Sequence, residues 1–399
     1  MSKLVPKLRF KEFSGEWEEK AILNIASMKA RIGWQNLRQD EHLDKGEYYL
    51  ITGTDFRDGI IDWGNAKYVE YDRYAQDKHI ILKEGDILIT KDGSIGKLAY
   101  VENIKEKKAT LNNGIFRIRI KDNNTKFIYY TFLSLQFKKF LEKLSAGSSI
   151  NHLYQKDFKT YKIILPISPK EQQKIANTLS SLDSLIEAQQ RKVEALKKHK
   201  KGLMQQLFPA EGANVPKLRF KEFSGEWEEK KFEKVFDRIP SKKYQIKSSE
   251  YLVKGKHPVI DQGKSKIIAY SNNTNKLFKN DGIIVFGDHT RILKYIDFNF
   301  IVGADGTQLI KTKENFNSRF FYYQILKNKI PNTGYNRHFK FIKDMLFVVP
   351  SEKEKQEQEK IANTLSSLDN LIGAHQRKVE ALKKHKKALM QQMFVSGEG

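Results

Sequence analysis

The sequence predicts an α+β protein in which two α/β domains are separated by two long helices that form an antiparallel coiled coil, with a pseudo-two-fold internal repeat. Three observations predict this fold. A 16-residue segment occurs twice without change, a helical segment occurs twice with few changes, and short β-rich runs fill the intervals between them. A chain of 399 residues also exceeds the size of one ordinary hydrophobic core.

The repeats define the order of the chain. The segment VPKLRFKEFSGEWEEK occupies residues 5–20 and again residues 215–230. The second repeat is 34 residues long, occupies 175–208 and 361–394, and matches at 29 positions. Near-identical frames around divergent intervals predict one scaffold that performs one task on two targets. Solenoid units are roughly 20–50 residues long, so two units of about 200 residues are two domains.

The repeats predict four segments, and local patterns predict elements within them. The segments are a first domain at 1–169, a first spacer helix at 170–210, a second domain at 211–355 and a second spacer helix at 356–399. In the first domain we expect strands at 48–51, 85–90, 115–120 and 161–166 and a helix at 127–144. In the second domain we expect strands at 258–260, 282–286, 307–310 and 346–350 and a helix at 318–327.

The spacer helices carry a heptad seam. From Ile175, apolar residues recur at alternating steps of four and three, and the second copy repeats the pattern from Ile361. Eight of the ten seam positions are apolar in each copy. Since a seam of this length needs another helix, we expect the two copies to pair antiparallel and to bring the C-terminus back near the N-terminus.

Polar residues interrupt this seam, and further apolar residues lie beside it. The interruptions are Gln189, Lys200, His375 and Lys386. Such residues either fix the register of a helix pair or lie where the seam splays, and both interpretations stay open. The additional apolar residues are Leu185, Met204, Leu371 and Met390. They leave surface either for a third partner or for the chain's own domains.

The charge of the chain indicates a polyanionic partner. Lys and Arg total 72 against 48 Asp and Glu, which gives a net charge of +24. A field that positive attracts nucleic acid first and anionic membrane second, although a basic protein without such a partner is the simpler alternative. The sequence contains no cysteine, which excludes disulfides and fits a reducing cytoplasm. We expect no membrane partner, because no apolar run approaches the roughly 20 residues of a membrane helix.

Sequence motifs for catalysis are missing. None of the nine prolines is adjacent to another, so the Asp/Asn-Pro-Pro-aromatic motif of N6-adenine methyltransferases is absent. Residues 93–97, GSIGK, lack the first glycine and the final Ser or Thr of a phosphate loop, and we interpret them as a hairpin turn. Asp86 with residues 106–108 resembles a nuclease cluster only loosely. The histidines show no metal-binding spacing. We expect no catalytic residue, metal or cofactor on this chain.

Candidate DNA contacts are polar residues in glycine-bearing segments between apolar runs, where a scaffold presents side chains. Arg and Lys pair with guanine, Asn and Gln with adenine, and Ser with bases or phosphates. In the first domain the candidates are Arg31, Gln35, Asn36, Lys91, Ser94, Ser148, Asn151 and His152. In the second domain they are Lys242, Lys243, Lys264, His289, Arg291, Asn336, Arg337 and His338. Each one taken singly has the alternative of being a solvated loop residue. The KKHKK runs at 197–201 and 383–387 are either solvated helix faces or phosphate contacts.

Three segments are similar to those of one known family. They are the flank V-P-x-L-R-F-x-x-F-x-G-E-W, residues 85–90 followed by 93–97, and residues 171–176, EQQKIA. With the order domain, helix, domain, helix, they resemble type I restriction-modification specificity subunits over nearly the whole chain. The second domain departs in detail at 282–285 and 287–289. That divergence is expected if it recognises a different sequence.

The resemblance implies that each domain is a target-recognition domain for one half of a bipartite, asymmetric site in double-stranded DNA. It implies that the helices set the gap and dock two methyltransferase (modification) subunits, which bind S-adenosylmethionine. Two motor-nuclease (restriction) subunits would join them and use ATP and Mg²⁺. A stand-alone DNA-binding regulator or scaffold is an alternative that predicts tight binding without partners. A single-chain enzyme is another, and predicts methylation or cleavage by this chain alone.

Overall fold

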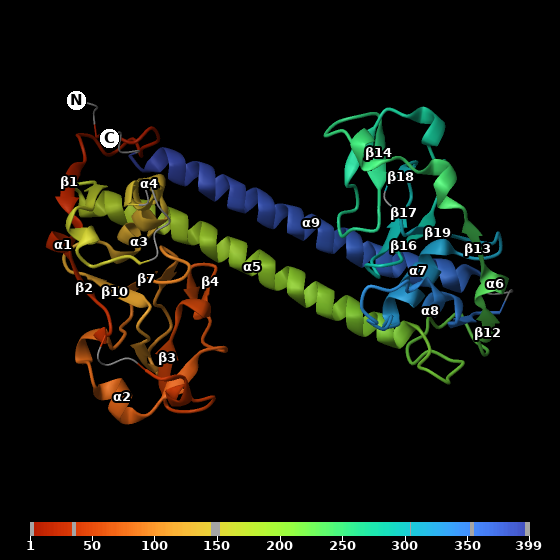
Figure 1. Ribbon diagram of the computed structural model, residues 1–399, viewed down its shortest axis with the longest axis horizontal. Helices are drawn as coiled ribbons and strands as arrows, with labels where there is room; N and C mark the ends of the chain where they lie inside the picture. Colours follow the sequence, from red (N-terminus) through yellow and green to blue (C-terminus); the bar gives the residue numbers. More distant parts are fainter. Residues whose placement is uncertain (1–3, 34–36, 145–151, 304, 352–354, 396–399) are drawn as a thin grey trace. The chain divides into compact units, whose positions relative to one another are not determined.

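Two compact units divide the chain in the computed structural model, which describes residues 4–33, 37–144, 152–303, 305–351 and 355–395. The first unit comprises Met1–Ala188 and Lys378–Gly399, and the second comprises Gln189–Arg377. The long helices are α5 (Pro169–Leu207) and α9 (Lys355–Met393). Each unit therefore contains the beginning of one long helix and the end of the other (Figure 1).

The first unit combines antiparallel and mixed sheets with short helices. Its strands are β1 (Glu18–Ala21), β2 (Ala26–Lys29), β3 (Tyr48–Ile51), β4 (Phe56–Arg57), β5 (Ile60–Ile61), β6 (Lys67–Val69), β7 (Ile87–Thr90), β8 (Leu98–Tyr100), β9 (Lys108–Leu111), β10 (Ile115–Ile120) and β11 (Lys162–Leu165). Its shorter helices are α1 (Ile22–Ile25), α2 (Tyr71–Ala75), α3 (Thr125–Leu133) and α4 (Leu135–Leu144). The sheet orders are β1-β11, β2-β10-β7-β8-β5-β4 and β6-β3-β9.

Apolar cores cover both faces of the six-stranded sheet. On β10, Phe116 and Ile118 belong to the core shared with α3, α4 and the beginning of α5, whereas Ile115 belongs to the core shared with β3 and β9. This division follows from the two-residue period of a strand. The strands predicted at 48–51 and 115–120 are confirmed as β3 and β10. The predicted hairpin turn at 93–97 is also confirmed, because it connects the antiparallel pair β7 and β8.

The helix predicted at 127–144 is in fact two helices. α3 ends at Leu133 and α4 begins at Leu135, because Ser134 is extended, with ψ at 171°. Its backbone N–H and its hydroxyl both donate to the carbonyl of Thr131, at 3.1 and 2.6 Å. A serine that bonds to the backbone in this way competes with the helix. The prediction of one helix was wrong because the apolar spacing continues across the bend.

The second unit repeats this layout with fewer strands in the main sheet. Its strands are β12 (Glu228–Lys231), β13 (Phe236–Ile239), β14 (His257–Ile260), β15 (Ala269–Ser271), β16 (Ile283–Gly287), β17 (Leu293–Ile296), β18 (Ile301–Val302), β19 (Thr307–Thr312) and β20 (Leu346–Val349). Its shorter helices are α6 (Phe232–Val235), α7 (Ser318–Lys327) and α8 (Phe339–Lys343). The sheet orders are β12-β20, β13-β19-β16-β17 and β15-β14-β18.

The core of the second unit is built in the same way. On β19, Ile310 packs in the core shared with α7 and both long helices, and Leu309 packs in the core behind the main sheet. The helix predicted at 318–327 is confirmed as α7. Asn317 begins it, since its side chain accepts hydrogen bonds from the backbone N–H groups of Arg319 and Phe320.

The repeated flank attaches each unit to its own long helix. In the first unit the guanidinium of Arg9 donates to both carboxylate oxygens of Glu171, at 2.8 and 2.7 Å. In the second unit Arg219 does the same to Glu357, at 2.9 and 2.8 Å. Both glutamates are buried. The repeated flank therefore forms the same two-pronged ion pair in both units. This geometry suits arginine and carboxylate.

In each unit the beginning of one long helix packs antiparallel against the end of the other. In the first unit Ile175 shares a core with Met393, and Asp183 of α5 pairs with Lys386 of α9 at 2.6 Å. The second unit repeats this with the helices exchanged, as the following contacts show. Lys200 of α5 pairs with Asp369 of α9 at 2.6 Å, and Gln189 lies 2.8 Å from His375 between Oε1 and Nδ1. All four polar seam residues thus have a partner on the other helix, which favours the register interpretation.

The apolar residues beside the seam divide into two groups. Met204 and Met390 pack against the cores of the second and the first unit, respectively. Leu185 and Leu371 occupy equivalent positions and remain 40% and 42% exposed. Among the described residues, no helix is both long enough and apolar enough to cross a membrane.

Candidate nucleic-acid interface

In the second unit, four loops meet at the β16 end that leads into the β16–β17 turn. The backbone N–H of Asp288 donates to the carbonyl of Gly306 at 2.7 Å, and the N–H of His338 donates to the carbonyl of Asp288 at 2.9 Å. The loop at 261–265 is attached to the loop at 305–306 by the Gln262 side chain, whose Nε2 donates to the carbonyl of Asp305 at 2.9 Å. Loops 261–265, 288–292, 305–306 and 330–338 therefore form one surface, held largely by backbone hydrogen bonds.

The first unit contains the same backbone frame. The N–H of Lys91 donates to the carbonyl of Gly114 at 2.8 Å, and the N–H of Leu153 donates to the carbonyl of Lys91 at 2.8 Å. Lys91 therefore corresponds to Asp288, and Leu153 corresponds to His338. Loops 91–97, 112–114 and 152–156 meet at the end of β7 as their counterparts meet at the end of β16.

The two frames carry different side chains on the same backbone. Lys91 stands where the other unit has Asp288, and Asp92 stands where it has His289. Asp92 contacts His152 of the returning loop, whereas the ring of His289 lies against Tyr335. A conserved scaffold with exchanged side chains is the arrangement expected of a surface that recognises two different targets.

Most of the described candidates lie on these loops. Ser94, Lys264, Asn336 and Arg337 are exposed, and Lys91, His152, His289 and Arg291 are partly exposed. Lys242 and Lys243 are exposed on the 3-10 turn Ser241–Tyr244. That turn reaches the same surface through Gln245, whose Nε2 donates to Asp305 at 2.9 Å. Gln35, Asn36, Ser148 and Asn151 lie outside the described residues.

Arg31 and His338 are candidates that the structure places inside their units. Arg31 is 2% exposed, and its guanidinium donates to the carbonyl of Leu111 at 2.8 Å and the hydroxyl of Thr110 at 3.2 Å. Burial lowers the pKa of Arg31. His338 is fully buried, with Nδ1 2.9 Å from the carbonyl of Asp288. Both side chains already use their polar atoms internally, so we correct their assignment from DNA contact to holding the loops.

Asp86 is an internal ion-pair partner and not part of a nuclease cluster. Its buried carboxylate accepts from the guanidinium of Arg119 at 2.8 and 2.7 Å, and Arg117 lies 3.7 Å away. Burial lowers the pKa of the Arg117 guanidinium, and Asp86 opposes that shift. Within the described residues, no group of three or more His, Asp or Glu side chains is placed to hold a metal ion.

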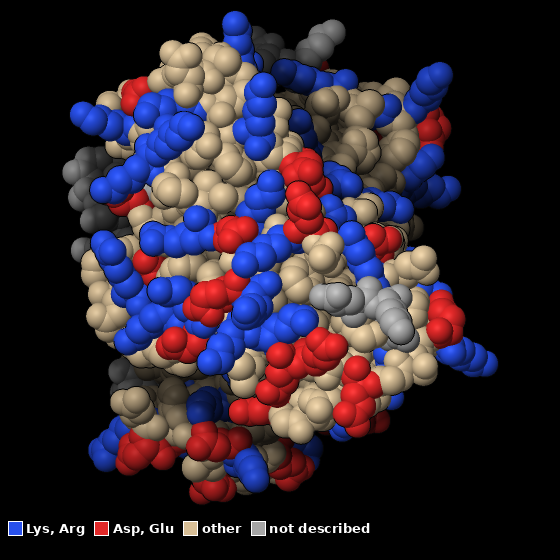
Figure 2. Space-filling model, turned by 90° about the vertical axis from the view of Figure 1, so that its right-hand side faces the viewer, with Lys and Arg blue, Asp and Glu red and all other residues tan. Residues whose placement is uncertain are grey.

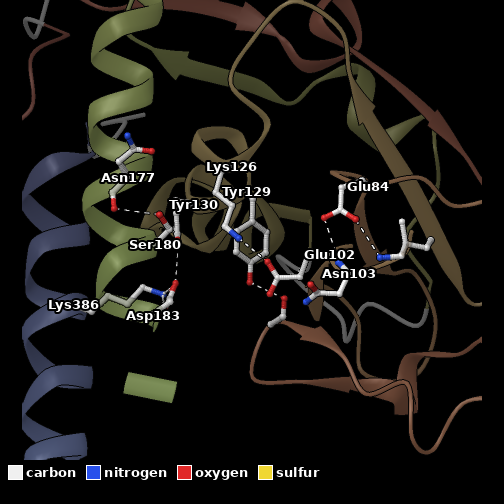
Figure 3. A network of polar contacts seen from close by, with 12 residues as sticks. Glu84, Glu102, Asn103, Lys126, Tyr129, Tyr130, Asn177, Ser180, Asp183 and Lys386 are labelled. Atoms are coloured by element: carbon white, nitrogen blue, oxygen red, sulfur yellow. Dashed lines mark hydrogen bonds and ion pairs between the residues drawn. The ribbon is translucent and has the colours of Figure 1, made fainter. Parts of the chain in front are cut away.

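A tyrosine, an aspartate and a lysine fasten the α/β part of each unit to both long helices. In the first unit the hydroxyl of Tyr130 donates to Asp183 at 2.7 Å, and Lys386 approaches the same carboxylate, as Figure 3 shows. In the second unit the hydroxyl of Tyr323 donates to Asp369 at 2.6 Å, and Lys200 donates to the same carboxylate. Burial, and then the carboxylate, raise the pKa of both tyrosines well above their usual range. The phenols therefore stay protonated and remain donors.

Charge on the second unit is dense but mixed. Figure 2 looks onto the side of this unit where β12 and α6 lie, and basic side chains there alternate with acidic ones. An open hollow on β12, α6 and β19 shows the same mixture. It is lined by Glu229, Lys230, Lys231, Lys234, Asp237, Lys311, Lys313 and Glu314 among others. Because opposite charges are interleaved, this face is a weaker anion site than the net charge suggests.

Two exposed aromatic residues on the loops were missed by the sequence analysis. Tyr335 stacks on His289, with Arg337 two residues further along the chain, and Tyr154 packs on His152. Residue type predicts hydrogen-bonding side chains of the kinds that pair with bases, and tyrosine is not among them. A glycine at 334 next to Tyr335 was the available signal, since a turn carries the ring into solvent there.

Duplicated α/β units that present different side chains from one backbone frame define a class of protein with two similar domains whose loop surfaces differ. A family model described as the type I restriction modification DNA specificity domain matches residues 15–198 and again residues 224–384. The chain belongs to the family of type I restriction-modification specificity subunits.

Individual relatives cover nearly the whole chain. The type I restriction enzyme MjaVIII specificity subunit of Methanocaldococcus jannaschii is 31% identical over 383 residues, which cover 88% of this chain and 86% of the relative. The crystal structure of a type I restriction-modification S subunit from M. genitalium has a TM-score of 0.66 at 18% identity, covering 99% and 100% of the two chains. A further solved chain, from a type I restriction-modification system, has a TM-score of 0.51 at 15% identity and covers 95% and 98%. These structures share the fold.

Proposed function

We propose that this chain is the DNA-reading subunit of a type I restriction-modification complex and that its two units recognise the two halves of a bipartite, asymmetric site in double-stranded DNA. The observation that carries the proposal is the repeated loop frame. Identical backbone hydrogen bonds hold Lys91 and Asp288, yet the side chains around them differ between the units. Direct readout needs such freedom, because each base pair presents its own donors and acceptors in the major groove.

The chain supplies recognition, and its partners supply the chemistry. Two modification subunits would carry S-adenosylmethionine, and two motor-nuclease subunits would use ATP and Mg²⁺. The equivalent residues Leu185 and Leu371 support a repeated docking surface, because each leaves an apolar side chain exposed at the same position of the repeated helix. The chain itself holds no cofactor in this proposal and acts on DNA in the cytoplasm, a location that a cysteine-free sequence suits.

Mapping methylated adenines tests the proposal. The chain is co-expressed with its modification subunit in a host that lacks other adenine methylation, and the genome is read by long-read sequencing. We expect a split motif of two unequal halves that appears only when both proteins are present. A stable complex of the two proteins without any such motif would contradict the proposal and favour a DNA-binding regulator or scaffold.

A further inference from the structure

Each unit holds an exposed tyrosine against a histidine beside its hairpin loop. In the second unit Tyr335 is 88% exposed, and its ring lies 4.9 Å from that of His289, with the planes 11° apart. In the first unit Tyr154 is 52% exposed and packs on His152 at 4.4 Å, with the planes 53° apart. A single exposed aromatic side chain is common on protein surfaces, but these two are held in place by neighbouring residues.

The histidine of the second unit is fixed by its surroundings. The backbone N–H of His289 donates to Gln262 at 3.3 Å. Gly306 has a φ of +81°, and a Cβ there would lie 3.0 Å from Cδ2 of His289, so glycine lets the loop approach the ring. The His289 Nδ1 atom is buried and makes no hydrogen bond within the described residues. One face of Tyr335 therefore rests on a fixed ring, and the other face is open to solvent.

The first unit fixes its tyrosine with different residues. The His152 ring contacts the carboxylate of Asp92, which belongs to the hairpin loop. Lys156 places its Nζ 5.2 Å from the centre of the Tyr154 ring. In the second unit the exposed Arg337 follows Tyr335 by two residues. The Tyr154 ring is thus accompanied by a cation, and Tyr335 has a basic residue close to it along the chain, which suits contact with a polyanion.

The two tyrosines occupy different positions in the shared frame. Tyr154 follows Leu153 directly, whereas Tyr335 precedes the corresponding His338 by three residues. A protein partner that docks alike on both units would need its contacts at matching positions. Different positions are expected instead where each unit fits its own ligand, and in this protein the ligand that differs between the units is the DNA half-site.

We propose that Tyr154 and Tyr335 contact bases of the half-site that their own unit recognises, through the free face of the ring, and that the neighbouring histidine positions each ring. The inference rests on the proposed function and adds specificity residues to it. In a duplex the groove edges of the base pairs are what a side chain can reach, and thymine presents its methyl group there for apolar contact with an aromatic ring. The tyrosine hydroxyl is not required for that contact.

Binding by the complete complex tests this proposal. The full-length chain with its modification subunits is titrated with a duplex that carries both half-sites and with duplexes in which one half-site is scrambled. We expect Tyr335→Leu to lower discrimination at one half-site by about tenfold or more and to leave the other unchanged. Tyr154→Leu should do the reverse. The variants Tyr154→Phe and Tyr335→Phe should keep most of the discrimination.

A matched control is available in Tyr71, which is also exposed but lies on α2 outside the loop frame. Tyr71→Leu should leave discrimination at both half-sites unchanged. Leucine variants at 154 and 335 that discriminate like the unmodified chain would overturn the inference, as would phenylalanine variants that lose as much as leucine. An unmodified chain with no preference for the intact duplex would overturn the proposed function, and this inference with it.

Discussion

Glu171 and Glu357 explain why the arginine of the repeated flank occurs in both copies. Each carboxylate is buried and accepts a two-pronged contact from an arginine of the flank, Arg9 or Arg219. A buried carboxylate is stable only when its charge is compensated, so neither partner can vary alone. The arginine of the flank is therefore retained in both copies, because each unit needs this ionic contact.

Glu171→Ala should destabilise the first unit by about 3 kcal/mol, because it leaves the Arg9 guanidinium without its carboxylate. Urea unfolding followed by circular dichroism measures the change. Lys174→Ala is the control, since Lys174 pairs with Glu12 in a half-exposed contact that should contribute far less to stability. Equal losses for the two variants would show that the buried pair has no special role.

Residue type alone predicted part of the candidate site. The exposed positions Ser94, Lys264 and Arg337 were predicted from polar side chains in glycine-bearing loops. Arg31 and His338 have the same chemistry but satisfy it internally. The sequence contains no signal that separates an internal donor from one that faces a ligand. The backbone hydrogen bonds that assemble the loops leave no trace in residue type either.

At the scale of elements, regular patterns were predicted well and local interruptions were not. The heptad spacing predicted helix pairing, and the structure adds that Asp183 and Asp369 receive the lysines of the opposite helix. Those aspartates lie beside the seam, and the spacing of the apolar residues does not predict which polar residues there form contacts between the helices. The break at Ser134 was not predicted, because it depends on the hydrogen bond of one hydroxyl and leaves the apolar spacing unchanged.

Gln189 and His375 allow a test of the register interpretation. They occupy the same position of the two helix copies and contact each other. The double substitution Gln189→Leu and His375→Leu replaces a half-buried polar pair by an apolar one, which should raise the Tm by about 2–4 °C. Thermal melting followed by circular dichroism measures this.

Gln376→Leu serves as the control for that experiment, because residue 376 is exposed on the same helix. It should leave the Tm unchanged. A double variant that melts lower than the unmodified chain would mean that the hydrogen bond between the side chains outweighs the apolar gain.

At the scale of the whole molecule, the net charge of +24 should dominate the affinity for DNA. Cations that neutralise phosphates release bound counterions, so binding weakens steeply with salt. We expect the binding constant of the complex to fall by about a thousandfold between roughly 50 and 200 mM salt, as for six or more phosphate contacts. Anisotropy titrations at several KCl concentrations measure the slope. A flat dependence would contradict phosphate contact as the main source of affinity.

Phe394 and Phe208 make equivalent contacts in different units. Phe394 lies 5.4 Å from Phe127 between ring centres, in the core of the first unit, and Phe208 lies 5.0 Å from Phe320 in the second. Each substitution by Ala should cost about 3–5 kcal/mol. Hydrogen exchange read by mass spectrometry should show lost protection in the first unit for Phe394→Ala and in the second for Phe208→Ala. Equal loss in both units for either variant would contradict this assignment.

The placement of Phe394 also sets an order of events during protein synthesis. The second unit is continuous in sequence, whereas the core of the first unit includes Met393 at the end of α9 and Phe394 directly after it. A ribosome makes the chain from its N-terminus. The unit that emerges first must therefore wait until the whole second unit, and then Met393 and Phe394, have been made before its core closes, with the surface around Trp17 open to water and to chaperones meanwhile. The unit that emerges second is the first to be complete.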